Sequence, residues 1–185
     1  MASYTVHYGR RVTVCHRGAV RLTDFTDLTD RPPPEPKTVR RYIIIAGRYL
    51  IYIEPDKLAE HAFEMLGEGF PAKLRQFDIL VAGRNFGCGS AREQAVTAII
   101  GLGIKAVVAC SFARTFYRNA INSGLPIVEC PELYPAVAEG DAIEIDLAGG
   151  AIRHNAATFS FPKYPESIRQ LLEVGGLASY LKSQL

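Results

Sequence analysis

Three glycines, a serine and an arginine stand close together in residues 83–93, which read Gly-Arg-Asn-Phe-Gly-Cys-Gly-Ser-Ala-Arg-Glu. Glycines let the backbone of a turn approach a ligand closely, and the start of a helix offers unpaired N–H groups to an anion. Ser90 adds a hydroxyl that could carry a proton, and Arg92 adds a guanidinium suited to a bidentate grip on a carboxylate. The pattern predicts an anion-binding site with a candidate proton carrier. A tight turn between a strand and a helix, without a ligand, is the alternative interpretation.

The residues on either side of this turn alternate between strand and helix patterns. An apolar run predicts a strand over residues 79–82, and a helix is predicted from 93 to 102. The same alternation continues with a strand at 105–109, a helix at 113–123 and a strand at 125–129. Short crossovers of this kind predict an α/β fold with a mostly parallel central sheet and a βαβα core.

Smaller elements are predicted on both sides of this core. They are one or two strands within 3–23, a helix over 56–66 behind Pro55, a small antiparallel sheet over 142–147, 151–154 and 158–161, and a helical tail over 168–172 and 177–181. Residues 31–37 contain four prolines, so they predict an exposed extended loop.

Composition restricts the class of protein. A chain of 185 residues with 48% hydrophobic and 22% charged residues predicts one globular domain over residues 1–185. A net charge of +2 without a long basic cluster argues against a nucleic-acid partner. The apolar runs have the length of strands, so no membrane partner is expected, and residues 1–11 lack a hydrophobic signal core, which favours the cytoplasm. The four cysteines show no short paired spacing, so neither a zinc site nor a disulfide framework is expected.

Three consecutive segments carry a family resemblance that runs from about residue 44 to residue 181. They are Asn-Phe-Gly-Cys-Gly-Ser-Ala-Arg-Glu at 85–93, Gly-Ile-Lys-Ala-Val-Val-Ala at 103–109 and Ser-Phe-Ala-Arg-Thr-Phe-Tyr-Arg-Asn-Ala-Ile-Asn at 111–122. Together they resemble the small subunit of 3-isopropylmalate dehydratase, a family similar to the homoaconitase small subunit and to the swivelling domain of aconitase. The resemblance implies a swivelling β/β/α domain.

This resemblance also implies a division of labour between two chains. In the family, a separate large subunit carries a [4Fe–4S] cluster, and the small subunit closes over a dicarboxylate substrate as a lid. Ser90 would then be the base that removes a proton next to a carboxylate, while Gly89 and Arg92 would contact the substrate. Ala91 stands where a second serine is common in the family, which implies altered binding with the base retained. The implied activity is that of a hydro-lyase of leucine biosynthesis.

The family reads the variable group of its substrate with a loop that matches Tyr49, Leu50, Ile51 and Tyr52. Homoaconitase-like members commonly have an arginine at the third position, ready for an extra carboxylate. Ile51 would leave such a carboxylate unpaired, whereas a branched alkyl group would gain about 1–3 kcal/mol there. The loop therefore favours an isopropyl or another small alkyl group. The alternative is that Ile51 is only a core residue of a strand.

Residues 17–41 depart from the family. Members usually carry an Asp/Asn-Thr-Asp motif just before the apolar run, and this chain has Arg40 and Arg41 there. A Thr-Asp pair occurs earlier and makes Asp30 a candidate site residue. Divergence, an insertion that displaces the motif, and a reading-frame error are the three explanations. The departure keeps open an inactive binding subunit with the same fold, besides the homoaconitase and alkylmalate dehydratase alternatives.

Other side chains that could do chemistry have structural interpretations that are simpler. Cys88 cannot hold a cluster alone and is expected to be a small buried thiol. His61 is expected to be a satisfied histidine of the helix at 56–66, and His154 is expected to face solvent beside a turn. Arg114 and Arg118 are expected to support the fold or to face a partner before they contact substrate.

Overall fold

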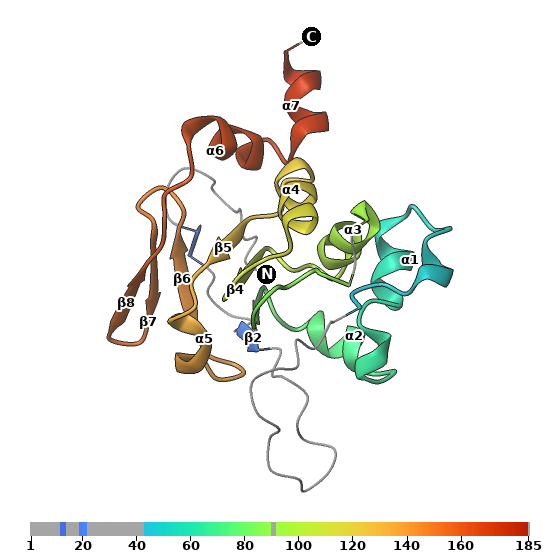
Figure 1. The fold of residues 1–185 in the computed structure, drawn as a ribbon, viewed down its shortest axis with the longest axis horizontal. Helices are drawn as coiled ribbons and strands as arrows, with labels where there is room; N and C mark the ends of the chain where they lie inside the picture. The colour runs from blue at the N-terminus through green and yellow to red at the C-terminus, as the bar shows by residue number, and fades with distance from the viewer. Residues whose placement is uncertain (1–11, 14–18, 22–42, 90–91, 185) are drawn as a thin grey trace, which may run out of the picture.

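The computed structural model describes residues 12–13, 19–21, 43–89 and 92–184 (Figure 1). Its strands form two sheets of four strands each. The parallel sheet has the order β2-β3-β4-β5, with bounds Ala19–Arg21, Ile79–Ala82, Ala106–Ala109 and Ile127–Glu129. The antiparallel sheet has the order β1-β6-β7-β8, with bounds Val12–Thr13, Ile143–Asp146, Ala151–His154 and Ala157–Ser160. The α/β class and the βαβα core are thus confirmed.

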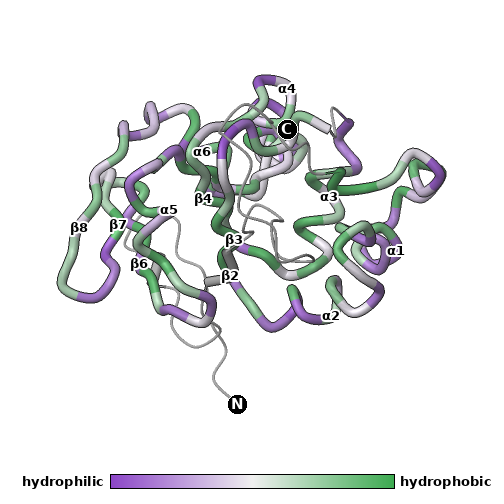
Figure 2. The backbone as a smooth tube through the Cα atoms, turned by 60° about the horizontal axis from the view of Figure 1, so that its bottom comes forward, coloured by the Kyte–Doolittle hydropathy of each residue, from purple (hydrophilic) through white to green (hydrophobic). Residues whose placement is uncertain are grey.

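The parallel sheet lies at the centre of the hydrophobic core. Every residue of β3 and β4 is buried, and both strands run through the interior as continuous apolar segments (Figure 2). Strands buried on both faces are typical of parallel sheets, because the crossover helices cover the faces. The register pairs Ile79 with Ala106 and Ala82 with Ala109, so β3 and β4 end level with each other.

Nine short helices complete the fold. Their bounds are η1 Gly47–Tyr49, α1 Pro55–Glu60, η2 Glu64–Leu66, α2 Phe70–Leu74, α3 Glu93–Gly101, α4 Arg114–Asn122, α5 Leu133–Ala136, α6 Glu166–Glu173 and α7 Leu177–Ser183, all within the residues that the structure describes. Helix α1 packs against α3, and α4 contacts α3, α6 and α7. Figure 1 shows α1, α2 and α3 on one side of the parallel sheet and the antiparallel sheet on the other. Within the described part of the chain, we find no helix with the length and apolar character that a membrane span requires.

The helix predicted over 56–66 is interrupted. Helix α1 ends at Glu60, and η2 begins four residues later. Between them Phe63 adopts a left-handed conformation with φ of 56°, and its N–H donates to the carbonyl of Ile44 at 2.7 Å. A bond to a distant residue therefore replaces the next helical hydrogen bond. The apolar spacing is still used, since Leu58 and Phe63 are both buried.

The three strands predicted for the antiparallel sheet are present, but the prediction for His154 is wrong. His154 is only 5% exposed. Successive side chains of β7 point to opposite faces of the sheet, and His154 lies on the same buried face as Ile152. Its Nε2 lies 2.9 Å from Oδ2 of Asp141. The N–H of Ala138 donates to the same carboxylate at 2.8 Å and, together with His154, lowers the pKa of Asp141.

Candidate active site

The candidate site lies at the carboxyl edge of the parallel sheet, where three neighbouring strands end. Ala82, Ala109 and Glu129 are the last residues of β3, β4 and β5. Residues 83–89, called the glycine turn below, follow β3 directly and lead toward α3. In open α/β sheets, ligands bind outside the carboxyl ends of the strands. The predicted strand, turn and helix therefore occupy the edge at which a ligand site is expected.

The glycine turn is fastened to the next turn of the sheet. The N–H of Asn85 donates to Oγ of Ser111 at 2.9 Å, and the N–H of Phe86 donates to the carbonyl of Ser111 at 2.9 Å. In return, the N–H of Ala113 donates to the carbonyl of Phe86 at 2.8 Å. Ser111 was not among the predicted site residues. The available signal was its place just after β4, the strand beside β3.

Aromatic rings form the floor under the glycine turn. Phe86 and Phe116 meet edge to face, with ring centroids 5.2 Å apart, and both are buried. Phe112 stacks on Phe116 at 6.2 Å. Gly87 has φ of 84° and lies directly on Phe116, so that no other residue fits at this point of the turn without displacing the ring. The backbone of the turn is therefore held from below by packing and from the side by hydrogen bonds.

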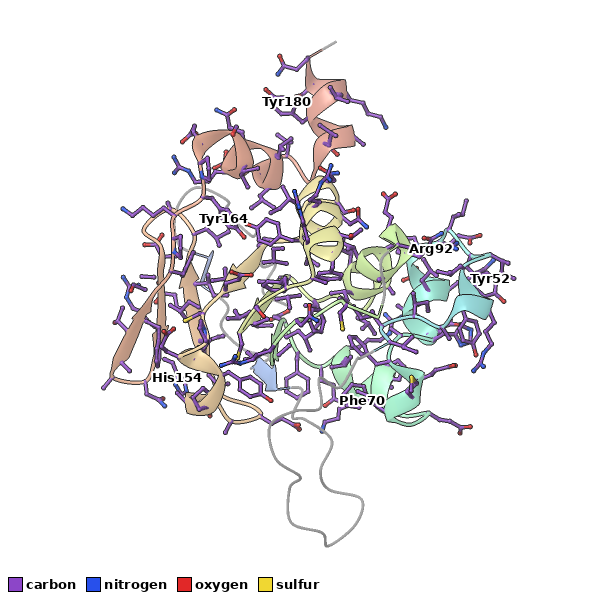
Figure 3. The ribbon with its side chains drawn as sticks, in the orientation of Figure 1. Tyr52, Phe70, Arg92, His154, Tyr164 and Tyr180 are labelled. Atoms are coloured by element: carbon purple, nitrogen blue, oxygen red, sulfur yellow. The ribbon has the colours of Figure 1, made fainter. Side chains whose placement is uncertain are left out.

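Helix α3 begins at the end of this turn and carries Arg92 at its N-cap. Arg92 has extended backbone angles, and Glu93 stands in the first turn, where a negative charge is favourable. The apolar side of the helix, with Val96 and Ile99, is fully buried. Arg92 is exposed, which Figure 3 also shows at the start of α3. The predicted position of Arg92 at a helix start beside the glycine turn is confirmed.

Four exposed arginines near this edge have no ion-pair partner among residues 43–89 and 92–184. They are Arg84, Arg92, Arg114 and Arg118. In contrast, Arg48, Arg153 and Arg169 are each paired with a glutamate. Unpaired arginines that follow β3 and β4 leave a positive potential at the end of the sheet, which suits an anionic ligand.

One carboxylate and two phenols also lie beside β5. Oε1 of Glu129 accepts a hydrogen bond from the N–H of Phe112 at 3.2 Å. Burial raises the pKa of Tyr117, and the nearby Glu129 raises it further. Burial also raises the pKa of Tyr164, whose hydroxyl donates to the carbonyl of Ile127. Both phenols therefore stay neutral at neutral pH and are poor candidates for the base of the site.

The loop of Tyr49, Leu50, Ile51 and Tyr52 reaches the same region. Nε2 of Gln94, on the first turn of α3, donates to the carbonyl of Leu50 at 3.5 Å. Ile51 is 79% exposed and lies in a turn after η1. The alternative that Ile51 is a core residue of a strand is therefore wrong. Figure 3 places Arg92 and Tyr52 toward the same side of the molecule.

The remaining predicted site residues lie at the end of the glycine turn or outside the described residues. Ser90, Ala91 and Asp30 lie outside the described residues, so their roles stay predictions. Gly89 is exposed at the end of the glycine turn. Cys88 was expected to be buried but is partly exposed, because it lies between the buried Gly87 and the exposed Gly89 of the turn.

Comparisons with known proteins place the chain in a family. The model of the aconitase C-terminal domain matches residues 53–132. A 3-isopropylmalate dehydratase small subunit from Caldicellulosiruptor bescii is 46% identical over 145 residues, which cover 77% of this chain and 87% of the relative. This chain belongs to the 3-isopropylmalate dehydratase small-subunit family.

Two further comparisons agree with the assignment. An isopropylmalate/citramalate isomerase small subunit from Methanocaldococcus jannaschii is 44% identical over 144 residues, covering 77% of this chain and 86% of the relative. A crystal structure of 3-isopropylmalate dehydratase from the same organism superposes with a TM-score of 0.69 at 45% identity, covering 76% of this chain and 84% of that one. The family resemblance and the aconitase-type fold are thus confirmed.

Among residues 43–89 and 92–184, no three side chains of His, Cys, Asp or Glu gather in a way that could hold a metal ion. Burial raises the pKa of Cys130, so its thiol stays protonated at neutral pH. The described donors therefore do not fit an iron–sulfur cluster.

Proposed function

We propose that this chain is the small subunit of a 3-isopropylmalate dehydratase, a two-chain hydro-lyase that interconverts 2-isopropylmalate and 3-isopropylmalate in leucine biosynthesis. The observation that carries the proposal is the 46% identity to a small subunit of that name over 87% of the relative's length. The geometry supports it, because the glycine turn, Arg92 and the loop with Ile51 converge beside one sheet edge.

The proposed chemistry begins with proton removal by Ser90. Its oxygen takes the proton from the carbon next to a carboxylate, the electron pair forms a double bond, and hydroxide leaves from the adjacent carbon. Water then adds across the double bond in the opposite sense, so that the hydroxyl changes carbon. The negative oxygen of Ser90 needs nearby donors, and the N–H groups at the end of the glycine turn and the Arg92 guanidinium are suited to that role. Arg92 also holds a substrate carboxylate.

The implied [4Fe–4S] cluster belongs, in this proposal, to the large subunit. The donors described above do not fit it, so no step is assigned to a metal on this chain. When bound to the large subunit, the cluster supplies the Lewis acid that assists departure of the hydroxyl group. The small subunit contributes the base, the carboxylate grip and the contact to the variable group.

Ile51 is proposed to select the variable group. Its side chain is 79% exposed at the end of the loop, so it is available to pack against a substrate rather than against the core. An apolar contact favours an isopropyl or a methyl group over a carboxylate. A methyl-substituted malate is the second candidate substrate, because a relative that is 44% identical is described as an isopropylmalate/citramalate isomerase small subunit.

The test is an anaerobic hydratase assay of this chain together with its iron-reconstituted large subunit. Isopropylmaleate, citraconate and homoaconitate are compared, with each subunit alone as a control. We expect turnover of isopropylmaleate that needs both chains, disappears with Ser90→Ala and is retained by Ser160→Ala, an exposed serine on β8. A preference for homoaconitate would refute the role of Ile51. Full activity of Ser90→Ala would refute the base assignment.

A second variant tests the carboxylate grip. Arg92→Lys keeps the charge but loses the two parallel hydrogen bonds of a guanidinium, so we expect kcat/KM to fall about 10- to 100-fold. Arg153→Lys is the matched control, because Arg153 lies on β7 and pairs with Glu144. Equal kcat/KM values for Arg92→Lys and Arg153→Lys would contradict the contact between Arg92 and the substrate.

A further inference from the structure

The loop that carries Ile51 is closed at its base by the backbone. The N–H of Phe63 donates to the carbonyl of Ile44 at 2.7 Å on one side of the loop. On the other side, the N–H of Leu58 donates to the carbonyl of Glu54 at 3.1 Å and starts α1. These bonds fix where the loop leaves and re-enters the core. They do not fix the direction in which its tip points.

The tip itself is only partly packed on the core, because Tyr49, Leu50 and Tyr52 are half-buried against it while the isoleucines between and beside them are not. Ile51 and Ile53 are each 79% exposed, although both are large apolar side chains. Two backbone hydrogen bonds, from Tyr49 N–H to Ala46 at 3.0 Å and from Tyr52 N–H to Tyr49 at 3.1 Å, shape the turn. Exposed backbone hydrogen bonds with few apolar contacts open easily. A contact on the rings of Tyr49 and Tyr52 would add to this partial packing, and to the bond from Gln94 to Leu50, in holding the tip in one position.

His61 supplies that contact. It caps the C-terminus of α1, and its imidazole stacks on the ring of Tyr49 with centroids 3.8 Å apart and planes 3° apart. The ring of Tyr52 lies on a nearly parallel plane, with its centroid 6.1 Å from the imidazole. Tyr49 and Tyr52 stand on the two sides of Ile51 in the sequence, so a single side chain contacts both ends of the segment that presents it.

Charged groups on the loop and on α1 extend this stack outward. The guanidinium carbon of Arg48 lies 4.9 Å from the centroid of Tyr49, and Arg48 pairs with Glu64. The ammonium of Lys57 lies 5.6 Å from the centroid of Tyr52. Each contact is exposed and contributes little alone. Each tyrosine ring therefore has a cation near it as well as the imidazole, whereas Ile51 between them stays exposed.

We propose that His61 is a positioning residue for substrate selection: its ring holds Tyr49 and Tyr52 and thereby fixes Ile51 toward the substrate. This inference rests on the proposed function for the identity of the substrate, but the restraint on the loop does not. His61 acts through the loop and touches no reacting atom. A flat ring is what the position requires, so phenylalanine replaces it and alanine does not.

The experiment uses the full chain assembled with its large subunit and compares His61→Ala, His61→Phe and Glu60→Ala. Glu60 is the control, because it is the exposed neighbour on α1 and takes no part in the stack. The first readout is amide hydrogen exchange of residues 47–53 by mass spectrometry, with β4 as an internal reference. The second is KM and kcat for isopropylmaleate and for citraconate.

We expect exchange in residues 47–53 to become about three- to ten-fold faster in His61→Ala, as the loss of one aromatic stack implies. KM for isopropylmaleate rises by a similar factor with kcat nearly unchanged, and citraconate is affected less, because its methyl group makes less contact with Ile51. We expect His61→Phe to show the same exchange rate in residues 47–53, and the same KM for isopropylmaleate, as the unmodified protein.

Three outcomes would overturn the inference. They are unchanged exchange of the loop in His61→Ala, equal acceleration in β4, and a failure of His61→Phe to restore the loop. If the unmodified enzyme does not turn over isopropylmaleate, the proposed function fails, while the exchange measurement still decides whether His61 restrains the loop.

Discussion

The substitution Gly87→Ala would add a methyl group where the glycine turn packs against the aromatic rings beneath it. A Cβ added at this position would lie 2.3 Å from Cγ and 2.4 Å from Cβ of Phe116. Phe116 is fully buried, with Phe86 at 5.2 Å on one side and Phe112 at 6.2 Å on another. The ring cannot withdraw without moving its neighbours, so the backbone of the turn must shift instead.

The expected destabilisation has two parts. A left-handed backbone, here with φ of 84°, costs an L-residue about 1–2 kcal/mol. Forcing extra volume into a packed core costs about 1–3 kcal/mol more. Gly103 isolates the first part, because it has nearly the same φ, 85°, and a Cβ there would meet nothing within 4 Å. We therefore expect a loss of about 2–5 kcal/mol for Gly87→Ala and about 1–2 kcal/mol for Gly103→Ala.

The assay is urea unfolding of the full chain followed by far-UV circular dichroism, since the sequence has no tryptophan to report by fluorescence. The free energies of unfolding of both variants are compared with that of the unmodified protein. If Gly87→Ala costs no more than Gly103→Ala, the turn does not rest on Phe116 as described. The reasoning about the aromatic floor would then be refuted.

Two further predictions concern groups away from the glycine turn. Tyr164→Phe removes a half-buried hydroxyl that donates to the carbonyl of Ile127 and accepts a hydrogen bond from the N–H of Ile127 at 3.2 Å. The free energy of unfolding in urea should fall by about 1–3 kcal/mol, and an unchanged midpoint would contradict this anchoring. The pKa of Asp141 is lowered below its usual 3.8 by the N–H of Ala138 and by His154, so its ionised form stabilises the folded state above that pH. The advantage over Asp141→Asn should be present at neutral pH and disappear as the pH falls through the lowered pKa; thermal melts from pH 7 to pH 2 measure it, and a pH-independent difference would refute it.

The elements around the glycine turn could be predicted from the sequence because their signals are local. Strand β3 is a continuous buried apolar run, and it was predicted with its observed bounds. Helix α3 begins at Glu93 as expected, because three glycines end the preceding regular structure and the apolar spacing starts there. The position of Arg92 at the sheet edge can be predicted from the end of β3 and the start of α3 alone. It needs no information on contacts between distant residues.

The features that were missed depend on residues far apart in the chain. The end of α1 is set by the bond from Phe63 to Ile44, and the polar partner of the buried His154 is Asp141 on the segment before β6. The support of the glycine turn by Ser111 likewise requires the register of β3 and β4. No window of the sequence contains both partners of such a contact, so periodicity and spacing predict the elements without predicting these bonds.

The bonds between the glycine turn and Ser111 have a consequence for the proposed site, which two chains would share. A loop that is free before two chains associate must lose its conformational entropy when they meet, which weakens the complex. Here the backbone of the turn is already ordered by Ser111 and Ala113 within one chain. The conformational entropy of the turn is therefore lost when the chain folds and not when two chains associate. A partner chain can dissociate and return many times and find the same edge each time.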